Sequence, residues 1–318
     1  MRRYNFHHVD VFADGPLAGN PLAVFPEAEG LTDAEMQAIA REFNLSETTF
    51  VLPPTDPAAA YRVRIFTPAS ELPFAGHPLV GTPWVMAQEG KVALRAPRAE
   101  FRQQVGIGTL PVTLETEPDP EATDGTRLRV RRVVMTQGTP RFGPEVSEAD
   151  RAAVAAALGL PPSAVGLPGL PPQVVSTGLA HLFVPVGTVE AVAALQPDLA
   201  AVGRLTERLA VIGIYAFALI RPPATGPATP VEVRSRFFAP SQGISEDPAT
   251  GSGAGPLAAY LSARGRLPGG RLTVHQGIEM GRPSRLEVEI EARDADGGTV
   301  VRVAGRVVPV ITGTLILP

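Results

Sequence analysis

"RFFAPSQGISEDPATGSGAGPL", Arg236 to Leu257, is the stretch that decides the fold, because it has a counterpart earlier in the chain. The counterpart, "VRIFTPASELPFAG", runs from Val63 to Gly76, and its "RIFTP" aligns with "RFFAP". After a short insertion, Gly76–Gly90 aligns with Gly251–Gly265, and each of these glycine-to-glycine segments contains an apolar run typical of a buried helix. The sequence therefore predicts two structurally similar halves.

A weaker similarity lies upstream of each repeated loop. "SETTFVLP" (Ser46–Pro53) resembles "LAHLFVP" (Leu179–Pro185), and this match would make Ala180 the counterpart of Glu47. Since the three matches follow one another in the same order, we interpret them as one internal duplication.

Composition limits the classes of protein to which this chain can belong. It has 318 residues, 44 % hydrophobic and 19 % charged, with a net charge of −4. That length favours two domains of roughly 100 to 200 residues each. No basic cluster predicts a nucleic-acid partner. No apolar run reaches the roughly 18 residues of a membrane span, and the polar N-terminus does not resemble a signal peptide. We expect a soluble cytoplasmic protein.

The predicted domain boundaries follow from the repeat and from one loop. The acidic, proline-containing stretch Glu115–Gly125 is the best candidate for a link between the halves. It separates a first half over 1–118 from a second half over 126–304, and a terminal strand over 305–318 is a candidate to return to the first half.

The clearest single helix is predicted in "LTDAEMQAIAREFN". Thr32 is a suitable N-cap, Glu35 completes a capping box, and Asn44 is expected to end the helix.

Each repeated loop leads from a strand through glycine into a helix. The first turn of a helix has unpaired N–H groups and the positive end of the helix dipole, which suit an anion. If the two halves face each other, two such ends point into one cleft, and a small carboxylate is the expected ligand. A Walker A loop would need a lysine that "ATGSGAG" lacks, and a dinucleotide fingerprint would need glycine at Pro256. A helix cap made of small residues is the structural alternative.

Three titratable residues close to these loops could transfer protons: Glu47, His77 and Asp247. Each also has a structural alternative: a solvated loop carboxylate or a partner for Arg41 in the case of Glu47, a helix cap for His77, and a partner of the helix dipole for Asp247. The adjacent pair His7 and His8, and His275, are interpreted as structural. Because the chain contains no cysteine, it has no disulfide, thiolate metal site or thiol nucleophile. No metal site and no cofactor are predicted.

At these residues the sequence resembles a known family. "DVFADGPLAGNPLAVF", "NLSETTFV", "RIFTPASELPFAGHPLVGT" and "RFFAPSQGISEDPATGSGAGPL" are similar to the PhzF-like phenazine-biosynthesis proteins, which share the diaminopimelate epimerase fold. The resemblance covers nearly the whole chain. It implies an α/β (α+β) protein of two pseudo-symmetric halves, each a mixed sheet wrapped around a central helix, with the active site in the cleft between them. It also implies a homodimer.

The resemblance further implies roles for individual residues. Glu47 would be the general acid/base, and His77 and Asp247 would complete the catalytic group. The implied substrate-binding residues are Asn20, Gly76, Gly251 and Ser252. Racemases and epimerases of this fold carry two cysteines at positions that correspond here to Ala75 and Thr250, so two-thiol racemisation is excluded.

The leading hypothesis is therefore a cofactor-independent isomerase that moves a proton on a small cyclic or unsaturated carboxylic acid. A second hypothesis is an epimerase that uses Glu47 and another base in place of thiols. The third is a non-catalytic protein that binds small acids or a protein partner.

Overall fold

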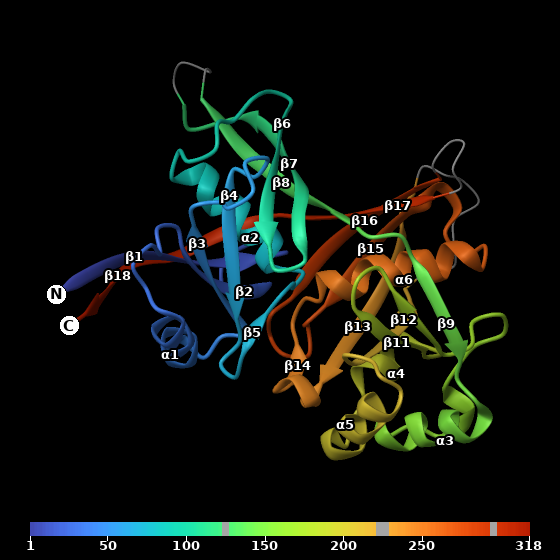
Figure 1. Cartoon of the computed structure of the whole chain (residues 1–318). Helices are drawn as coiled ribbons and strands as arrows, with labels where there is room; N and C mark the ends of the chain where they lie inside the picture. The colour runs from blue at the N-terminus through green and yellow to red at the C-terminus, as the bar shows by residue number, and fades with distance from the viewer. Residues whose placement is uncertain (123–126, 221–228, 293–297) are drawn as a thin grey trace. The chain divides into compact units, whose positions relative to one another are not determined.

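The computed structural model describes residues 1–122, 127–220, 229–292 and 298–318 (Figure 1). The chain divides into two compact units: unit 1 comprises Met1–Thr136 and Ala304–Pro318, and unit 2 comprises Gln137–Val303. The expected link, Glu115–Gly125, does not separate these units. It begins within β7 (Gly108–Pro118) and continues toward β8 (Leu128–Gln137), the antiparallel partner of β7, and its residues 123–125 fall outside the described part. An acidic, proline-containing composition is equally suited to a hairpin loop within one unit.

Unit 1 is built on a mixed sheet. Its strands run in the order β18, β1, β2, β3, β4, β6, β7, β8; β2–β3 and β4–β6 are parallel pairs, and the other neighbours are antiparallel. The two ends of the chain lie side by side, since β1 pairs with β18 (Figure 1). The remaining bounds are β1 Arg2–Val11, β2 Asn20–Phe25, β3 Glu47–Leu52, β4 Tyr61–Phe66, β5 Glu71–Leu72, β6 Arg98–Val105 and β18 Val307–Leu317. The short β5 pairs with the end of β4.

Two helices accompany the sheet of unit 1. The prediction for α1 (Asp33–Phe43) is confirmed: Thr32 and Glu35 form the capping box, and Asn44 ends the helix in the left-handed conformation at φ 50°. In α2 (Pro78–Gln88) every residue from Pro78 to Ala87 is buried, as expected for a helix that is apolar on all sides and is surrounded by its sheet.

Unit 2 has a second mixed sheet. Its strands run β9, β10, β11, β12, β13, β15, β16; β11–β12 and β13–β15 are parallel, and β14 pairs with β13. The bounds are β9 Arg141–Glu145, β10 Gln173–Ser176, β11 Ala180–Pro185, β12 Ile214–Leu219, β13 Val231–Ala239, β14 Ile244–Asp247, β15 Arg271–Gln276, β16 Ser284–Ala292 and β17 Thr299–Gly305, whose end belongs to unit 1.

The central helix of unit 2 is α6 (Gly251–Ala263), which is buried from Gly251 to Leu261. Small residues allow the sheet to approach it closely: a Cβ atom on Gly253 would lie 2.6 Å from the ring of Tyr215. Three further helices pack with β11 and β12 around a separate apolar core: α3 (Glu148–Ala157), α4 (Val189–Ala193) and α5 (Leu199–Arg208).

The two units repeat one pattern of strand pairing, and this pattern corrects the weakest of the predicted matches. β2, β3 and β4 are connected as β11, β12 and β13 are, so β3 corresponds to β12, not to β11. Thr48 pairs with Phe66 as Ile214 pairs with Phe238, and these two phenylalanines align in the sequence repeat. The counterpart of Glu47 is therefore Gly213, not Ala180. The mistaken match rested on a short "FV" run that many buried strands would share.

Within the described residues, no helix is long and apolar enough to cross a membrane.

Candidate active site

The first cluster of candidate residues lies in unit 1, where β2, β3 and α2 begin. Glu47 is the first residue of β3 and is only 7 % exposed, which excludes the solvated loop carboxylate. His77 immediately precedes α2, but its side chain makes no capping hydrogen bond. Its Nδ1 lies 3.5 Å from Oε2 of Glu47 instead. Asn20 is the buried first residue of β2, and Leu22 of the same strand pairs with Glu47.

His77 is a neutral imidazole. Burial lowers its pKa to about 3, and a hydrogen bond with the backbone of Pro21 opposes this shift. Nε2 is buried and has no hydrogen-bond partner within the described residues, so the contacts to Pro21 and Glu47 fall to Nδ1. Because the ring carries no charge at neutral pH, it does not itself neutralise the negative charge of an ionised Glu47.

The second cluster of candidate residues lies in unit 2, between β14 and α6. Asp247 is the last residue of β14 and is 7 % exposed. Its Oδ2 accepts a hydrogen bond of 2.5 Å from Oγ1 of Thr250, the residue that precedes α6. The carboxylate is therefore held against the loop by a side chain, which the sequence did not predict.

A network of buried hydrogen bonds, centred on Gln276, holds the loop between β14 and α6. Nε2 of Gln276 donates to the carbonyl of Asp247 at 2.7 Å and to Oγ1 of Thr250 at 2.9 Å. Oε1 of Gln276 accepts from the hydroxyl of Tyr215 at 2.8 Å and from the backbone N–H of Thr250 at 3.3 Å. Gln276 uses both ends of its amide to tie the loop to the sheet. The sequence does not predict these hydrogen bonds, because Gln276 lies on a strand that is distant along the chain from Asp247 and Tyr215.

Replacement of Gln276 should lower the stability of the folded protein. In Gln276→Leu the hydroxyl of Tyr215 and the N–H of Thr250 lose their buried acceptor, and each unsatisfied group costs about 1 to 3 kcal/mol. We expect the free energy of unfolding to fall by about 2 to 4 kcal/mol, measured from the denaturation midpoint at constant m-value. Gln242→Leu, at an exposed position, is the matched control and should change it by less than about 0.5 kcal/mol. Equal midpoints for the two variants would contradict the importance of the network.

Both loops present backbone N–H groups at the start of the central helix. In unit 1 the N–H groups of Gly76 and His77, and in unit 2 those of Gly251 and Ser252, donate no hydrogen bond to any residue that the structure describes. Such adjacent N–H groups beside the positive end of a helix dipole are donors for an anion. Neither helix start is capped by its own side chain, so the simple structural cap does not account for these loops.

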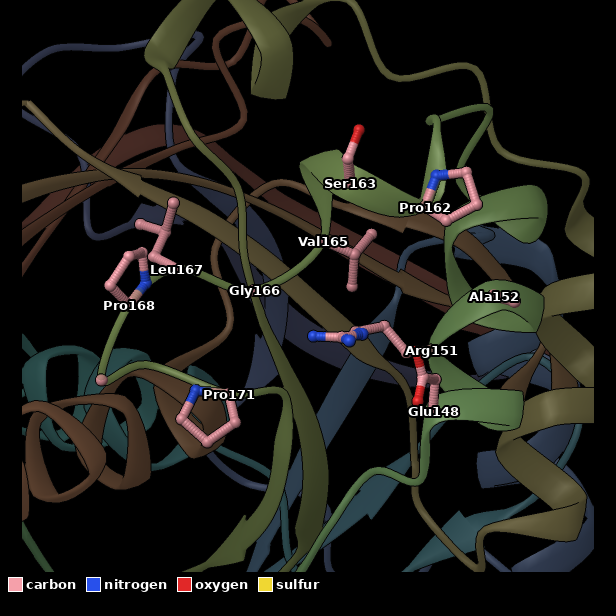
Figure 2. Close-up of a pocket in the computed structure, with 11 residues that line it drawn as sticks. Glu148, Arg151, Ala152, Pro162, Ser163, Val165, Gly166, Leu167, Pro168 and Pro171 are labelled. Atoms are coloured by element: carbon pink, nitrogen blue, oxygen red, sulfur yellow. The ribbon is translucent and has the colours of Figure 1, made fainter.

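A pocket of about 650 Å³ in unit 2 is separate from these residues (Figure 2). It is lined by the start of α3 and by the proline-rich stretch from Pro162 to Pro171, and the guanidinium of Arg151 points into it. The carbonyl of Pro171 accepts a hydrogen bond from Tyr260, in the second half of α6, so the pocket lies away from the helix start. Its position does not make it part of the candidate site. Among the described residues, no group of three or more histidine or acidic side chains is placed to hold a metal ion.

This chain is similar in sequence and in structure to known proteins of one family. The model of the PhzC-PhzF family, described as phenazine biosynthesis-like protein, matches residues 9–313. The trans-2,3-dihydro-3-hydroxyanthranilate isomerase of Pseudomonas fluorescens is 37 % identical over 317 residues, which cover 99 % of this chain and 100 % of that protein. A predicted epimerase from Pseudomonas aeruginosa has a similar structure, with a TM-score of 0.78, 33 % identity, and coverage of 99 % of this chain and 100 % of that one.

A more distant structure extends the likeness in fold alone. A probable proline racemase from Agrobacterium radiobacter has a TM-score of 0.66 at 14 % identity, over 99 % of this chain and 93 % of that one. The predicted fold class, two epimerase-like halves each with a mixed sheet and a central helix, is confirmed.

Proposed function

The chain belongs to the phenazine biosynthesis-like (PhzC-PhzF) family and is an isomerase, and we propose that Glu47 moves a proton on a small cyclic or unsaturated carboxylic acid. The observation that carries the proposal is the buried pair of Glu47 and neutral His77 in unit 1, where the N–H groups of Gly76 and His77 donate to no residue that the structure describes. No cofactor takes part in the proposed reaction.

Glu47 has the environment of a general base. Its carboxylate is almost fully buried, and its histidine neighbour is uncharged, so no cation lowers its basicity from that side. A carboxylate with this environment can remove a proton from carbon next to an unsaturated or carboxylated centre and return it to another carbon. The free Nε2 of His77 can accept a hydrogen bond from an N–H or O–H group of the substrate.

The N–H groups explain why the substrate would be an acid. Gly76 and His77 in one unit, and Gly251 and Ser252 in the other, offer neutral donors to a carboxylate, and helix dipoles add to the attraction. A neutral donor set binds an anion without placing a permanent counter-charge next to the base. In unit 1 we propose that Asn20 binds a polar group of the substrate, and in unit 2 we propose a catalytic role for Asp247.

The difference between the halves favours isomerisation over epimerisation. Inversion by two bases requires a proton donor or acceptor on each face of the reacting carbon. The counterpart of Glu47 in unit 2 is Gly213, and a Cβ atom there would overlap the ring of Phe237. The chain also lacks the two thiols of the epimerases. A single glutamate that removes and returns the proton is the simpler chemistry for this residue set.

The similarity to a trans-2,3-dihydro-3-hydroxyanthranilate isomerase makes that compound the first substrate to test. The purified protein is incubated with it in D₂O and followed by proton NMR. We expect conversion to an isomer with a shifted double bond, with or without deuterium at the carbon that receives the proton. Failure with this compound would direct the same assay to a panel of small cyclic and unsaturated acids.

The alternatives predict other products. An epimerase would give a product of unchanged connectivity, inverted at one carbon and labelled there with deuterium. A binding protein would give neither conversion nor carbon-bound deuterium across the panel, while acids still raise its melting temperature. Either result would overturn proton transfer by isomerisation.

A homodimer and a cytoplasmic location stay predictions. The first is tested by light scattering on the purified chain, and the second by fractionation of cells that produce it.

A further inference from the structure

Each unit contains a short hairpin whose two strands are joined by an arginine–glutamate ion pair. In unit 1, Arg64 of β4 contacts Glu71 of β5: Nε donates to Oε1 at 2.7 Å and Nη2 donates to Oε2 at 2.6 Å. In unit 2, Arg236 of β13 contacts Glu246 of β14 through the same atoms, and both hydrogen bonds are 2.8 Å long. Because each contact is bidentate, the planar guanidinium fixes the orientation of the glutamate as well as its distance.

The two ion pairs occupy equivalent positions of the internal repeat. The arginines belong to the aligned segments "RIFTP" and "RFFAP", and the glutamates align after the insertion. Strand pairing gives the same correspondence: Leu72 and Asp247, each directly after its glutamate, are paired with equivalent residues of β4 and β13. Equivalent hairpins therefore carry the same ion pair, but the residue that follows the glutamate is leucine in unit 1 and a carboxylate in unit 2.

The ion pair of unit 2 is the more deeply buried of the two. The side chains of Arg236 and Glu246 are 9 % and 16 % exposed, whereas those of Arg64 and Glu71 are 18 % and 41 % exposed. When a buried ion pair loses one partner, the other charge stays in the protein without compensation. Breaking the pair should therefore disturb its hairpin more in unit 2 than in unit 1.

Arg236 also connects the hairpin to the separate apolar core of unit 2. Its Nη1 donates to the carbonyl of Leu195, just after α4, at 2.8 Å. Its guanidinium lies over the ring of Phe238, 5.0 Å from the centroid. Leu195 and Phe238 are both members of that core. Glu246 is thus held by a cation that is itself fixed to well-packed residues.

The position of Glu246 bears directly on Asp247, the next residue of β14. Successive side chains of a strand point to opposite faces. Glu246 contacts Arg236 on one face. Asp247 lies on the other, where its Oδ2 accepts the hydrogen bond from Thr250. Holding the main chain at Glu246 therefore limits where the carboxylate of Asp247 can lie.

We propose that Arg236 is a positioning residue, whose bidentate ion pair with Glu246 fixes the end of β14 and so places the carboxylate of Asp247 for the reaction. This inference rests on the proposed function for the role of Asp247. The rigidity of the strand end can be tested without a substrate.

The first test measures amide hydrogen exchange over residues 244–250 in the absence of ligand. Glu246→Gln keeps the size of the side chain but removes its charge and one of its two acceptor oxygens, so exchange should become at least about tenfold faster. Glu291→Gln is the matched control, because Glu291 pairs with Arg302 at 2.7 Å but is 60 % exposed and lies on β16. It should leave exchange over 244–250 unchanged.

Arg236→Lys is a second variant, in case Glu246→Gln does not fold. Lysine keeps the cation for Glu246 and a donor for the carbonyl of Leu195, but it cannot form the bidentate contact. Exchange over 244–250 should again become faster than in the wild type. Exchange at the wild-type rate in the folded variants would overturn the proposal.

The second test is a double-mutant cycle on whichever acid the isomerase assay identifies. Glu246→Gln should lower kcat by about tenfold and change KM by less than about twofold. In an Asp247→Asn background the same substitution should lower kcat by less than about twofold, because a residue that acts through Asp247 then has no carboxylate to place. Glu291→Gln should leave kcat and KM unchanged.

Losses of kcat that multiply in the double variant would overturn the proposal, because a general loss of stability acts independently of Asp247. Faster exchange in Glu246→Gln, together with no turnover of the tested acids by the wild type, would reject the proposed function alone.

Discussion

Glu47→Gln is expected to bind substrate with near-unchanged affinity and to lose about 10²- to 10⁴-fold in turnover, the usual contribution of general acid–base catalysis. The substitution keeps the size and hydrogen-bonding reach of a side chain that is 7 % exposed. The amide can still contact His77 but cannot accept a proton. The loss should therefore appear in kcat, with KM close to that of the wild type.

Two further variants serve as a comparison and a control for the loss of turnover in Glu47→Gln. Asp247→Asn should lose less than Glu47→Gln, because the Asp247 carboxylate already accepts a hydrogen bond from Thr250 and is expected to orient the substrate. Glu42→Gln, at an exposed position on α1, should leave both constants unchanged. Normal turnover by Glu47→Gln would remove this residue from the mechanism and leave Asp247 or His77 as the base.

The fold could be predicted from sequence because its strongest signals are local. The capping box of Thr32 and Glu35 and the apolar runs of α2 and α6 fall within single elements, and the structure confirms each of them. The order of the strands in the sheets is not local. The "FV" pair in β3 resembles that in β11, but only the pairing of β12 with β13 identifies the true counterpart of β3.

As with the fold, only some residues of the candidate site could be selected from the sequence. Glu47 and His77 come from separate elements, and the repeat together with the family resemblance selected both; the structure brings their side chains together within unit 1. The supporting residues were not predictable. Gln276 reaches the carbonyl of Asp247 only because the sheet of unit 2 brings its strands around α6. An isolated glutamine on a strand carries no sequence signal for such a contact.

Acidification should destabilise the protein well above the range in which carboxylates protonate. His77 and His181 are buried and neutral, and burial lowers their pKa values to about 3 and about 4 from the ordinary 6.5. Below pH 6.5 the unfolded chain binds two protons that the folded chain does not, so stability falls as pH falls toward 4. Each group contributes up to about 1.4 kcal/mol per pH unit in this window.

At pH 5 the two histidines together should cost about 4 kcal/mol relative to pH 7.5, a large part of the roughly 5 to 15 kcal/mol that stabilises a typical domain. Urea denaturation at half-unit steps between pH 7.5 and 4.5 measures the slope. His181→Gln and His77→Asn should each reduce that slope by about one proton, because neither side chain titrates. A wild-type stability that stays level down to pH 5, or variants with the wild-type slope, would mean that these imidazoles accept protons while folded. His77 would then carry a positive charge 3.5 Å from Glu47, and the argument that its histidine neighbour is neutral would fail with it.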